Sequence, residues 1–206
     1  MNRICVATSK ARAYYALVSR LRRAGLPFSS ILPDSDSSEC DLVLTTRDEA
    51  GQFGGSTLVL EDLDENPGVF KGQVVSKLNG ADDVILVGVD PGKSTGLAVF
   101  YGQTRLAFNT FDSAGAVCSR VGIFAKRVPS ARMLVRVGNG NRPMTMRLVD
   151  GLRKEVPSAT VEVVDESGTS TGSSKMKGVQ RDQAAAAKIA FRKGEIVSRS
   201  TTRIRG

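Results

Sequence analysis

Short hydrophobic runs alternate with polar turns in the first part of the chain. The apolar run in RICVAT (residues 3–8) predicts a strand, and helical spacing over residues 9–25 predicts a helix that ends at Gly25. Three further β-type runs follow: FSSIL, DLVLTT and STLVLED. Strands mixed with a helix in this way predict a small α/β domain with a parallel sheet over residues 1–80. The polar segment 64–83 is interpreted as a linker with a short helix.

A different order of elements is predicted from residue 82 onwards. DVILVGVD (83–90) is apolar almost throughout, which is typical of a strand buried on both faces. Two more β-type runs continue a meander to residue 111, and the remaining pattern predicts the full order β, β, β, α, β, α, β, α. The last helix follows the polar loop 167–178, and a basic tail is expected from residue 195 to 206. The chain is therefore predicted to be an α/β protein with a second domain over residues 82–194.

The amino-acid composition excludes several kinds of catalytic and metal site. The 206 residues include no histidine, which excludes catalytic triads with a His base and His-ligated zinc. Cys5, Cys40 and Cys118 are far apart and odd in number, so they are interpreted as buried thiols of a cytoplasmic protein. No stretch is long and apolar enough to span a bilayer, and no signal-peptide pattern is seen, so no membrane partner is expected.

The charge is distributed unevenly along the chain. Residues 1–81 carry 9 Lys and Arg against 10 Asp and Glu, whereas residues 82–206 carry 20 against 11. A basic second part predicts a nucleic-acid partner, with a basic surface that serves only solubility as the alternative. Aromatic residues are few and dispersed, so a platform for base stacking is not predicted, and a structured DNA or RNA recognised by its backbone is favoured.

The segment GVDPGKSTG (residues 88–96) contains the most specific motif. A Walker phosphate loop would need glycine at position 87, where Val87 stands, and the residues that follow are β-type rather than helical. The segment is therefore predicted to be strand, tight turn and strand. Asp90 then closes the first strand at the carboxyl edge, where α/β sites tend to lie. A turn residue is the alternative, because Asp, Pro and Gly all favour turns.

This motif and two later segments resemble the ribonuclease H-like superfamily, and within it the Holliday junction resolvases of the RuvC and YqgF types. VGVDPGKSTGLAVF resembles the first-strand motif of the RuvC type, VEVVDESGTST resembles the Asp-Glu segment of the YqgF type, and RDQAAAAKIAF is similar to the final helix of both. The resemblance covers about residues 82–194 and implies a mixed sheet flanked by helices. It does not cover residues 1–80, whose role stays open.

The resemblance implies a site of three carboxylates, Asp90, Glu166 and Asp182, with Asp165 as the alternate for the second. Such acids would hold Mg²⁺ or Mn²⁺, because magnesium prefers oxygen ligands, and two ions can neutralise the charge that develops in phosphodiester cleavage. A polar loop start is the alternative for Glu166, and an acid that stabilises a helix start is the alternative for Asp182. A fourth acid of the resolvase pattern is replaced by Ala185, which fits the YqgF-like version better.

Basic residues near these acids are expected to contact phosphates. They are Lys93, Lys175, Lys177, Arg181, Arg192 and Lys193. The leading functional prediction is a metal-dependent nuclease, a hydrolase of nucleic-acid phosphodiesters. A non-catalytic nucleic-acid-binding module is the first alternative, and a phosphotransferase of the sugar-kinase type, disfavoured by the length of the chain, is the second. The oligomeric state is left open, with a homodimer as one possibility.

Overall fold

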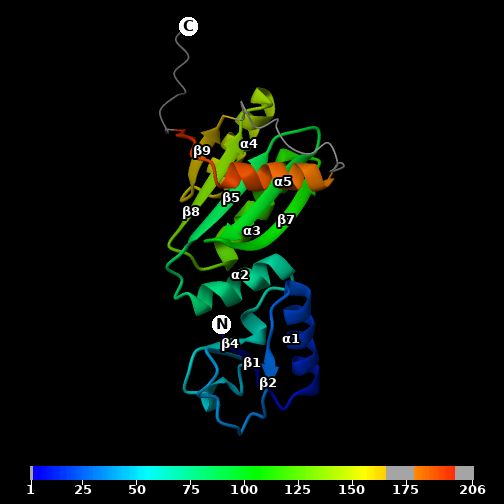
Figure 1. Cartoon of the computed structure of the whole chain (residues 1–206), viewed down its shortest axis with the longest axis vertical. Helices are drawn as coiled ribbons and strands as arrows, with labels where there is room; N and C mark the ends of the chain where they lie inside the picture. The colour runs from blue at the N-terminus through cyan, green and yellow to red at the C-terminus, as the bar shows by residue number, and fades with distance from the viewer. Residues whose placement is uncertain (1, 166–178, 198–206) are drawn as a thin grey trace. The chain divides into compact units, whose positions relative to one another are not determined.

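The structure, a computed structural model, describes residues 2–165 and 179–197. The chain forms two compact units (Figure 1). The N-terminal unit comprises Met1–Asp83 with Lys126–Ser130, and the C-terminal unit comprises Val84–Ala125 with Ala131–Gly206. None of the helices in the described part of the chain is both long and apolar enough to cross a bilayer.

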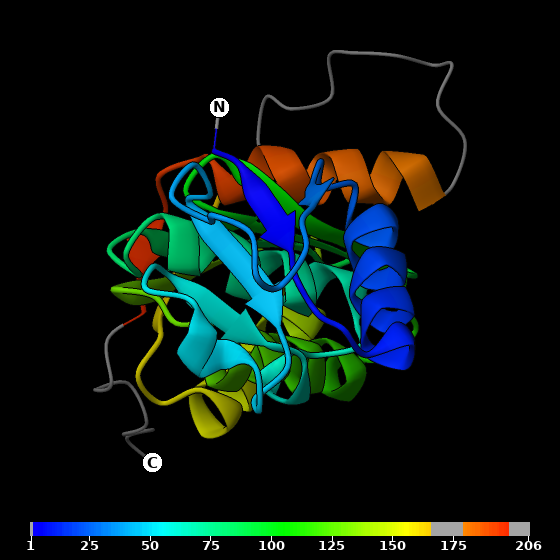
Figure 2. The same ribbon diagram turned by 90° about the horizontal axis from the view of Figure 1, so that it is seen from below.

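The N-terminal unit is built on a parallel sheet of four strands in the order β2-β1-β3-β4. The strands are β1 (Ile4–Val6), β2 (Ser29–Ser30), β3 (Leu42–Thr45) and β4 (Thr57–Val59). Its helices are α1 (Ala11–Ala24) and α2 (Pro67–Leu78), with short 3₁₀ turns η1 (Ala50–Gln52) and η2 (Leu60–Asp62). Figure 2 shows the strands side by side, with α1 next to them. The predicted small α/β domain with a parallel sheet is confirmed.

The helix α2 is the short helix expected within residues 64–83, but the interpretation of this segment as a linker is wrong, because the segment belongs to the N-terminal unit. Asn66 caps its first turn by accepting hydrogen bonds from the backbone N–H groups of Gly68 and Val69, and Pro67 occupies the first turn. Phe70 and Val74 are fully buried and pack in one core with residues of α1, β1 and β3. More than half of the residues of α2 are buried, so the helix is part of the core of this unit.

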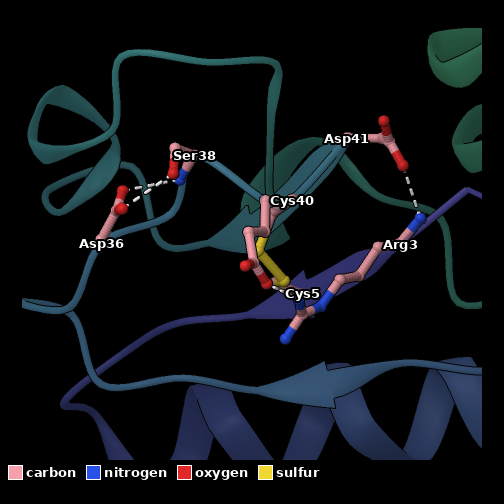
Figure 3. Close-up of a disulfide and its surroundings, with 7 residues drawn as sticks. Arg3, Cys5, Asp36, Ser38, Cys40 and Asp41 are labelled. Atoms are coloured by element: carbon pink, nitrogen blue, oxygen red, sulfur yellow. Dashed lines mark hydrogen bonds and ion pairs between the residues drawn. A yellow bond between two sulfur atoms is a disulfide. The ribbon is translucent and has the colours of Figure 1, made fainter.

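The cysteines also differ from their predicted state. Cys5 and Cys40 form a disulfide with a Cα–Cα distance of 5.9 Å, and only Cys118 is a buried free thiol (Figure 3). The two residues are 35 positions apart, but the segment before β3 passes close to β1 because these two strands pair. Disulfides are uncommon in the reducing cytoplasm, so the cysteines no longer support a cytoplasmic location.

Polar contacts beside the disulfide hold the same segment. The backbone N–H of Arg3 donates to Asp41 Oδ2 at 2.6 Å, and the Arg3 guanidinium forms an ion pair with Glu39. Within the loop, the backbone N–H of Ser38 donates to Asp36 Oδ1 at 2.8 Å, as Figure 3 shows. The loop before β3 is thus fastened to the start of the chain by the disulfide and by several polar contacts with Arg3.

The C-terminal unit contains a mixed sheet of six strands in the order β10-β9-β8-β5-β6-β7. Its strands are β5 (Val84–Asp90), β6 (Thr95–Tyr101), β7 (Thr104–Phe111), β8 (Arg132–Gly138), β9 (Thr160–Val164) and β10 (Glu195–Ile196). Its helices are α3 (Ala114–Arg127), α4 (Arg142–Glu155) and α5 (Val179–Ala190). The predicted order of eight elements is confirmed. The short strand β10 is added from residues predicted to be a tail.

The directions of the strands define the fold. β5, β6 and β7 form an antiparallel meander, β8 and β9 continue the sheet parallel to β5, and β10 is antiparallel to β9. The helix α5 crosses one face of this sheet, while α3 and α4 lie over the other (Figure 1). This is the ribonuclease H-like mixed sheet flanked by helices, and the predicted fold class is confirmed.

The two faces of the central strand β5 bury different partners. Leu86 on one face packs with Ala186 and Ala190 of α5. Val87 and Val89 point to the opposite face and are fully buried. Burial on both faces explains why the strand is apolar almost throughout its length.

Candidate active site

The carboxyl edge of the C-terminal sheet gathers the ends of three parallel strands. β5 ends at Asp90, β8 at Gly138 and β9 at Val164. The antiparallel β6 begins at the same edge with Thr95. Residues that directly follow or close these strands are therefore brought to one edge, although they are far apart in the sequence.

Asp90 lies on the face of the sheet that α5 covers. A Cβ atom added at Gly88 would lie 2.0 Å from the carbonyl oxygen of Ala186 and 2.6 Å from the backbone nitrogen of Ala190. Gly88 therefore faces the helix, and the helix backbone rests directly on it. Side chains two residues apart in a strand share a face, so half-buried Asp90 points to the α5 side as well.

Asp182, in the first turn of α5, lies at the same corner. Gly96 of β6 is the register partner of Asp90, and a Cβ atom added at Gly96 would lie 2.3 Å from the carbonyl oxygen of Asp182. The hydroxyl of Ser94 donates to Asp182 Oδ2 at 2.7 Å. The two glycines, Gly88 and Gly96, thus let α5 approach closely enough to place Asp182 above the strand pair that carries Asp90.

An unsatisfied hydroxyl lies in the same row of residues. Thr110 of β7 pairs with Gly96, so its side chain shares the face of Gly96 and Asp90. Its Oγ1 atom is buried and has no hydrogen-bond partner in the described structure. Buried polar groups nearly always have a partner, so an orphaned oxygen here is consistent with a further polar species, a water or an ion, under the start of α5.

Of the two candidates for the second acid ligand, Asp165 and Glu166, the structure describes only Asp165. Asp165 is exposed, and its Oδ1 accepts a hydrogen bond from Asn139 Nδ2 at 3.2 Å. Asp165 directly follows the last residue of β9, and its carbonyl oxygen accepts a hydrogen bond from Arg192 at 2.7 Å. Glu166 lies outside the described residues.

The donor set at this corner is made of oxygens. Among residues 2–165 and 179–197, no three Asp, Glu or Cys side chains form a group that could hold a metal ion. Asp90 and Asp182 offer two carboxylates on one face, which suits the oxygen preference of magnesium, and further ligands would have to come from outside this pair. The residues present are therefore compatible with a magnesium ion but do not complete its coordination.

The far end of α5 is anchored by a charged pair that the sequence did not reveal. Arg136 of β8 donates from Nε to Glu162 Oε2 at 2.8 Å and from a second guanidinium nitrogen to the carbonyl oxygen of Ala190 at 2.7 Å. Glu162 also accepts from the backbone N–H of Gly194 at 3.2 Å. The signal was a charged residue inside each of two largely apolar strands, Arg136 in β8 and Glu162 in β9, and these two positions prove to be register partners.

The predicted phosphate-contacting residues are spread around α5. Lys93, in the turn between β5 and β6, is exposed, as are Arg181 and Lys193. Arg192 is half-buried and donates to the carbonyl oxygen of Asp165 at 2.7 Å. Lys175 and Lys177 lie outside the described residues.

A second buried acid, Glu49, lies in the N-terminal unit, and the sequence did not reveal it either. It accepts hydrogen bonds from the hydroxyls of Ser9 and Thr46 at 2.6 and 2.7 Å, from the backbone N–H of Ser9 at 2.8 Å, and from Thr8. Burial by itself raises the pKa of Glu49, but these hydrogen bonds outweigh burial and lower the pKa to about 2. The carboxylate joins the loops after β1 and β3, so its evident role is structural.

Comparisons with known proteins add little. No protein-family model matches the chain, and no curated protein matches it either. The matching solved structures include the crystal structure of Marinitoga piezophila Argonaute in complex with 5' OH guide RNA, at 12% sequence identity and a TM-score of 0.28. The match covers 80% of this chain and 39% of that chain. At this TM-score the similarity does not indicate a function, which depends on the site residues themselves.

Proposed function

We propose that the chain is a metal-dependent nucleic-acid phosphodiester hydrolase of the type that its resemblance to RuvC- and YqgF-type proteins implies. The observation that carries the proposal is the position of Asp182 over Gly96, the register partner of Asp90. Two acids that are 92 positions apart in the sequence thereby share one corner of the sheet. The substrate class is structured DNA or RNA. A cytoplasmic location and a homodimer stay predictions.

The proposed ligands are Asp90, Asp182 and, as the third acid, Glu166. Magnesium or manganese, when bound, supplies positive charge to the attacking and leaving oxygens of the phosphodiester. Asp90 is held in place by strand β5, and the Ser94 hydroxyl orients the Asp182 carboxylate through Oδ2. Lys93 is exposed in the turn between β5 and β6, and we assign it a contact with a phosphate of the substrate.

Cleavage of a panel of branched DNA and structured RNA tests this proposal. We expect cleavage with Mg²⁺ or Mn²⁺ and none in excess chelator. Asp90→Asn should abolish cleavage while the variant still binds the substrate, because the ligand charge is lost and the basic surface is kept. Asp150→Asn, which removes an exposed acid on α4, is the matched control and should cleave normally. Cleavage that persists in chelator would contradict the mechanism.

A non-catalytic nucleic-acid-binding module is the alternative, because no three acids among the described residues form a group that could hold a metal ion. The two functions differ in their response to metal. In a nuclease, magnesium offsets the repulsion between the acids and the phosphates, so affinity for an uncleavable substrate should rise when magnesium is added. In a binding module, magnesium only competes for phosphates, and Asp90→Asn should tighten binding with or without metal. The affinities of the wild-type protein and of Asp90→Asn for the uncleavable substrate, measured with and without magnesium, distinguish the two functions.

A further inference from the structure

Three phenylalanines that are dispersed in the sequence gather on the α5 side of the C-terminal sheet. The rings of Phe100 and Phe108 meet edge to face, with centroids 5.8 Å apart, and those of Phe100 and Phe191 do the same at 4.8 Å. Phe100 is buried, whereas Phe191, directly after the end of α5, is 53% exposed. Aromatic residues that are dispersed in the sequence are therefore brought together in the folded chain, and the ring of Phe191 is left exposed.

The exposed ring is fixed in position rather than loose. Phe191 packs against Phe100, which in turn packs against Phe108, so the three rings support one another. The preceding turn of α5 is anchored by the hydrogen bond from Arg136 to the carbonyl oxygen of Ala190. A ring held in this way loses little conformational freedom when a ligand binds to it.

Positive charge surrounds the rings. The guanidinium carbon of Arg105 lies 5.1 Å from the centroid of the Phe108 ring, a cation–π contact, and Arg105 is exposed. Lys188 is exposed and lies three residues before Phe191, and exposed Lys193 follows two residues after it. One exposed acid, Glu195, comes next along the chain. We call Arg105, Phe108, Lys188 and Phe191 the Phe191 patch.

We propose that the Phe191 patch binds an unpaired base of a single-stranded nucleic acid. An exposed aromatic ring offers a stacking surface that accepts any base, and flanking cations neutralise the phosphates on either side of it. This inference rests on the proposed function, since it assumes that the C-terminal unit binds nucleic acid, and adds that single-stranded segments are part of the ligand.

The position of the patch relates it to the candidate active site. Asp182 and Phe191 lie at opposite ends of α5, nine residues apart, which corresponds to roughly 13 Å along a helix. Both sites are on the α5 side of the sheet. A nucleic acid at the candidate site would therefore pass unpaired nucleotides along α5, beside Lys188, to reach Phe191.

A second copy of this chain is a weaker candidate for the occupant. Two copies that met symmetrically through Phe191 would bring Arg105, Lys188 and their equivalents together, and like charges at an interface are repulsive. A polyanion with apolar bases matches both the charge and the exposed ring, which is why the nucleic acid is favoured.

The test compares a short oligothymidylate with an abasic oligonucleotide of the same length and charge, by fluorescence anisotropy on the full chain in chelator. Wild-type protein should bind the oligothymidylate more tightly. Phe191→Leu, which keeps apolar packing against Phe100 but removes the aromatic face, should weaken that binding by about 5- to 100-fold and leave abasic binding unchanged. Phe191→Trp should keep the preference, and Met146→Ala, at an exposed apolar residue of α4, is the control.

The outcomes separate this inference from the proposed function. Equal binding of both oligonucleotides by wild-type protein would overturn the Phe191 patch and leave phosphate binding by the basic unit intact. Binding of neither oligonucleotide, nor of any structured nucleic acid, would overturn both. Loss of self-association in Phe191→Leu, seen by sedimentation without any effect of bases, would show that the patch is a dimer contact instead.

Discussion

Gly96 is the single residue on which the corner between Asp90 and Asp182 depends most directly. We expect Gly96→Ala to destabilise the C-terminal unit by about 1–3 kcal/mol, because the new methyl group would lie 2.3 Å from the carbonyl oxygen of Asp182, and helix backbone cannot yield as a flexible side chain can. The measurement is the free energy of urea unfolding followed by circular dichroism. Gly115→Ala is the control, since a Cβ atom there would meet nothing within 4 Å. A neutral Gly96→Ala would show that α5 does not rest on β6.

Glu49 links the stability of the N-terminal unit to pH. Its folded pKa of about 2 lies below its ordinary value of 4.5, so the stabilisation that it supplies is complete above about pH 4.5 and is lost as the pH falls toward 2. The loss should reach about 2–3 kcal/mol, and Glu49→Gln should show a flatter dependence over that window. Unfolding of both proteins at a series of pH values checks this, with Asp34→Asn, at an exposed acid, expected to follow the wild type.

Helix α5 is positioned as an element by contacts at both of its ends. Ser94 bonds Asp182 in its first turn, and the Arg136–Glu162 pair holds the carbonyl oxygen of Ala190 in its last. Cations near a helix C-terminus also interact favourably with the helix dipole. Loss of the charged pair should therefore loosen the element that carries Asp182.

Removal of one partner of this pair should cost more than removal of both. Arg136→Met leaves Glu162 largely buried without its cation and the carbonyl oxygen of Ala190 without its donor, so we expect a loss of about 3–5 kcal/mol. Arg136→Met combined with Glu162→Leu should be more stable than Arg136→Met alone, because no uncompensated charge remains. Chemical denaturation of the wild type, both single variants and the double variant forms the cycle. A loss in the double variant equal to the sum of the two single losses would mean that the pair is not coupled.

At the scale of the whole molecule, charge separates the two units. The excess of basic residues lies from residue 82 onwards, so nucleic-acid affinity should depend on cations of the C-terminal unit and fall steeply with salt. Lys188→Gln with Lys193→Gln should reduce the slope of log affinity against log salt by about 0.7–0.9 for each phosphate that the protein no longer neutralises. Arg12→Gln with Arg22→Gln, on the exposed surface of α1, changes the net charge equally and should leave the slope unchanged. Equal effects of the two pairs would show that binding is not localised.

Hydrophobic periodicity and turn residues predicted most of the helices and strands. The helix expected over residues 9–25 is α1, which ends where Gly25 adopts φ 65°, and the strand–turn–strand expected around Asp90 is the β5–β6 hairpin. The short helix expected within residues 64–83 is α2, but the segment is not a linker, because Phe70 and Val74 pack in the core of the N-terminal unit. Periodicity and turn chemistry act over a few residues, which is why a single sequence shows them.

By itself, the sequence determined the order of the strands and helices, the separation of charge, and the exclusion of chemistry that needs a histidine. Only the tertiary structure decided which distant residues meet: Cys5 with Cys40, Arg136 with Glu162, and Phe100 with Phe191. The physical reason is that such pairs depend on strand register and on how closely a helix docks. Those are set by packing across the whole sheet, and no local pattern encodes them.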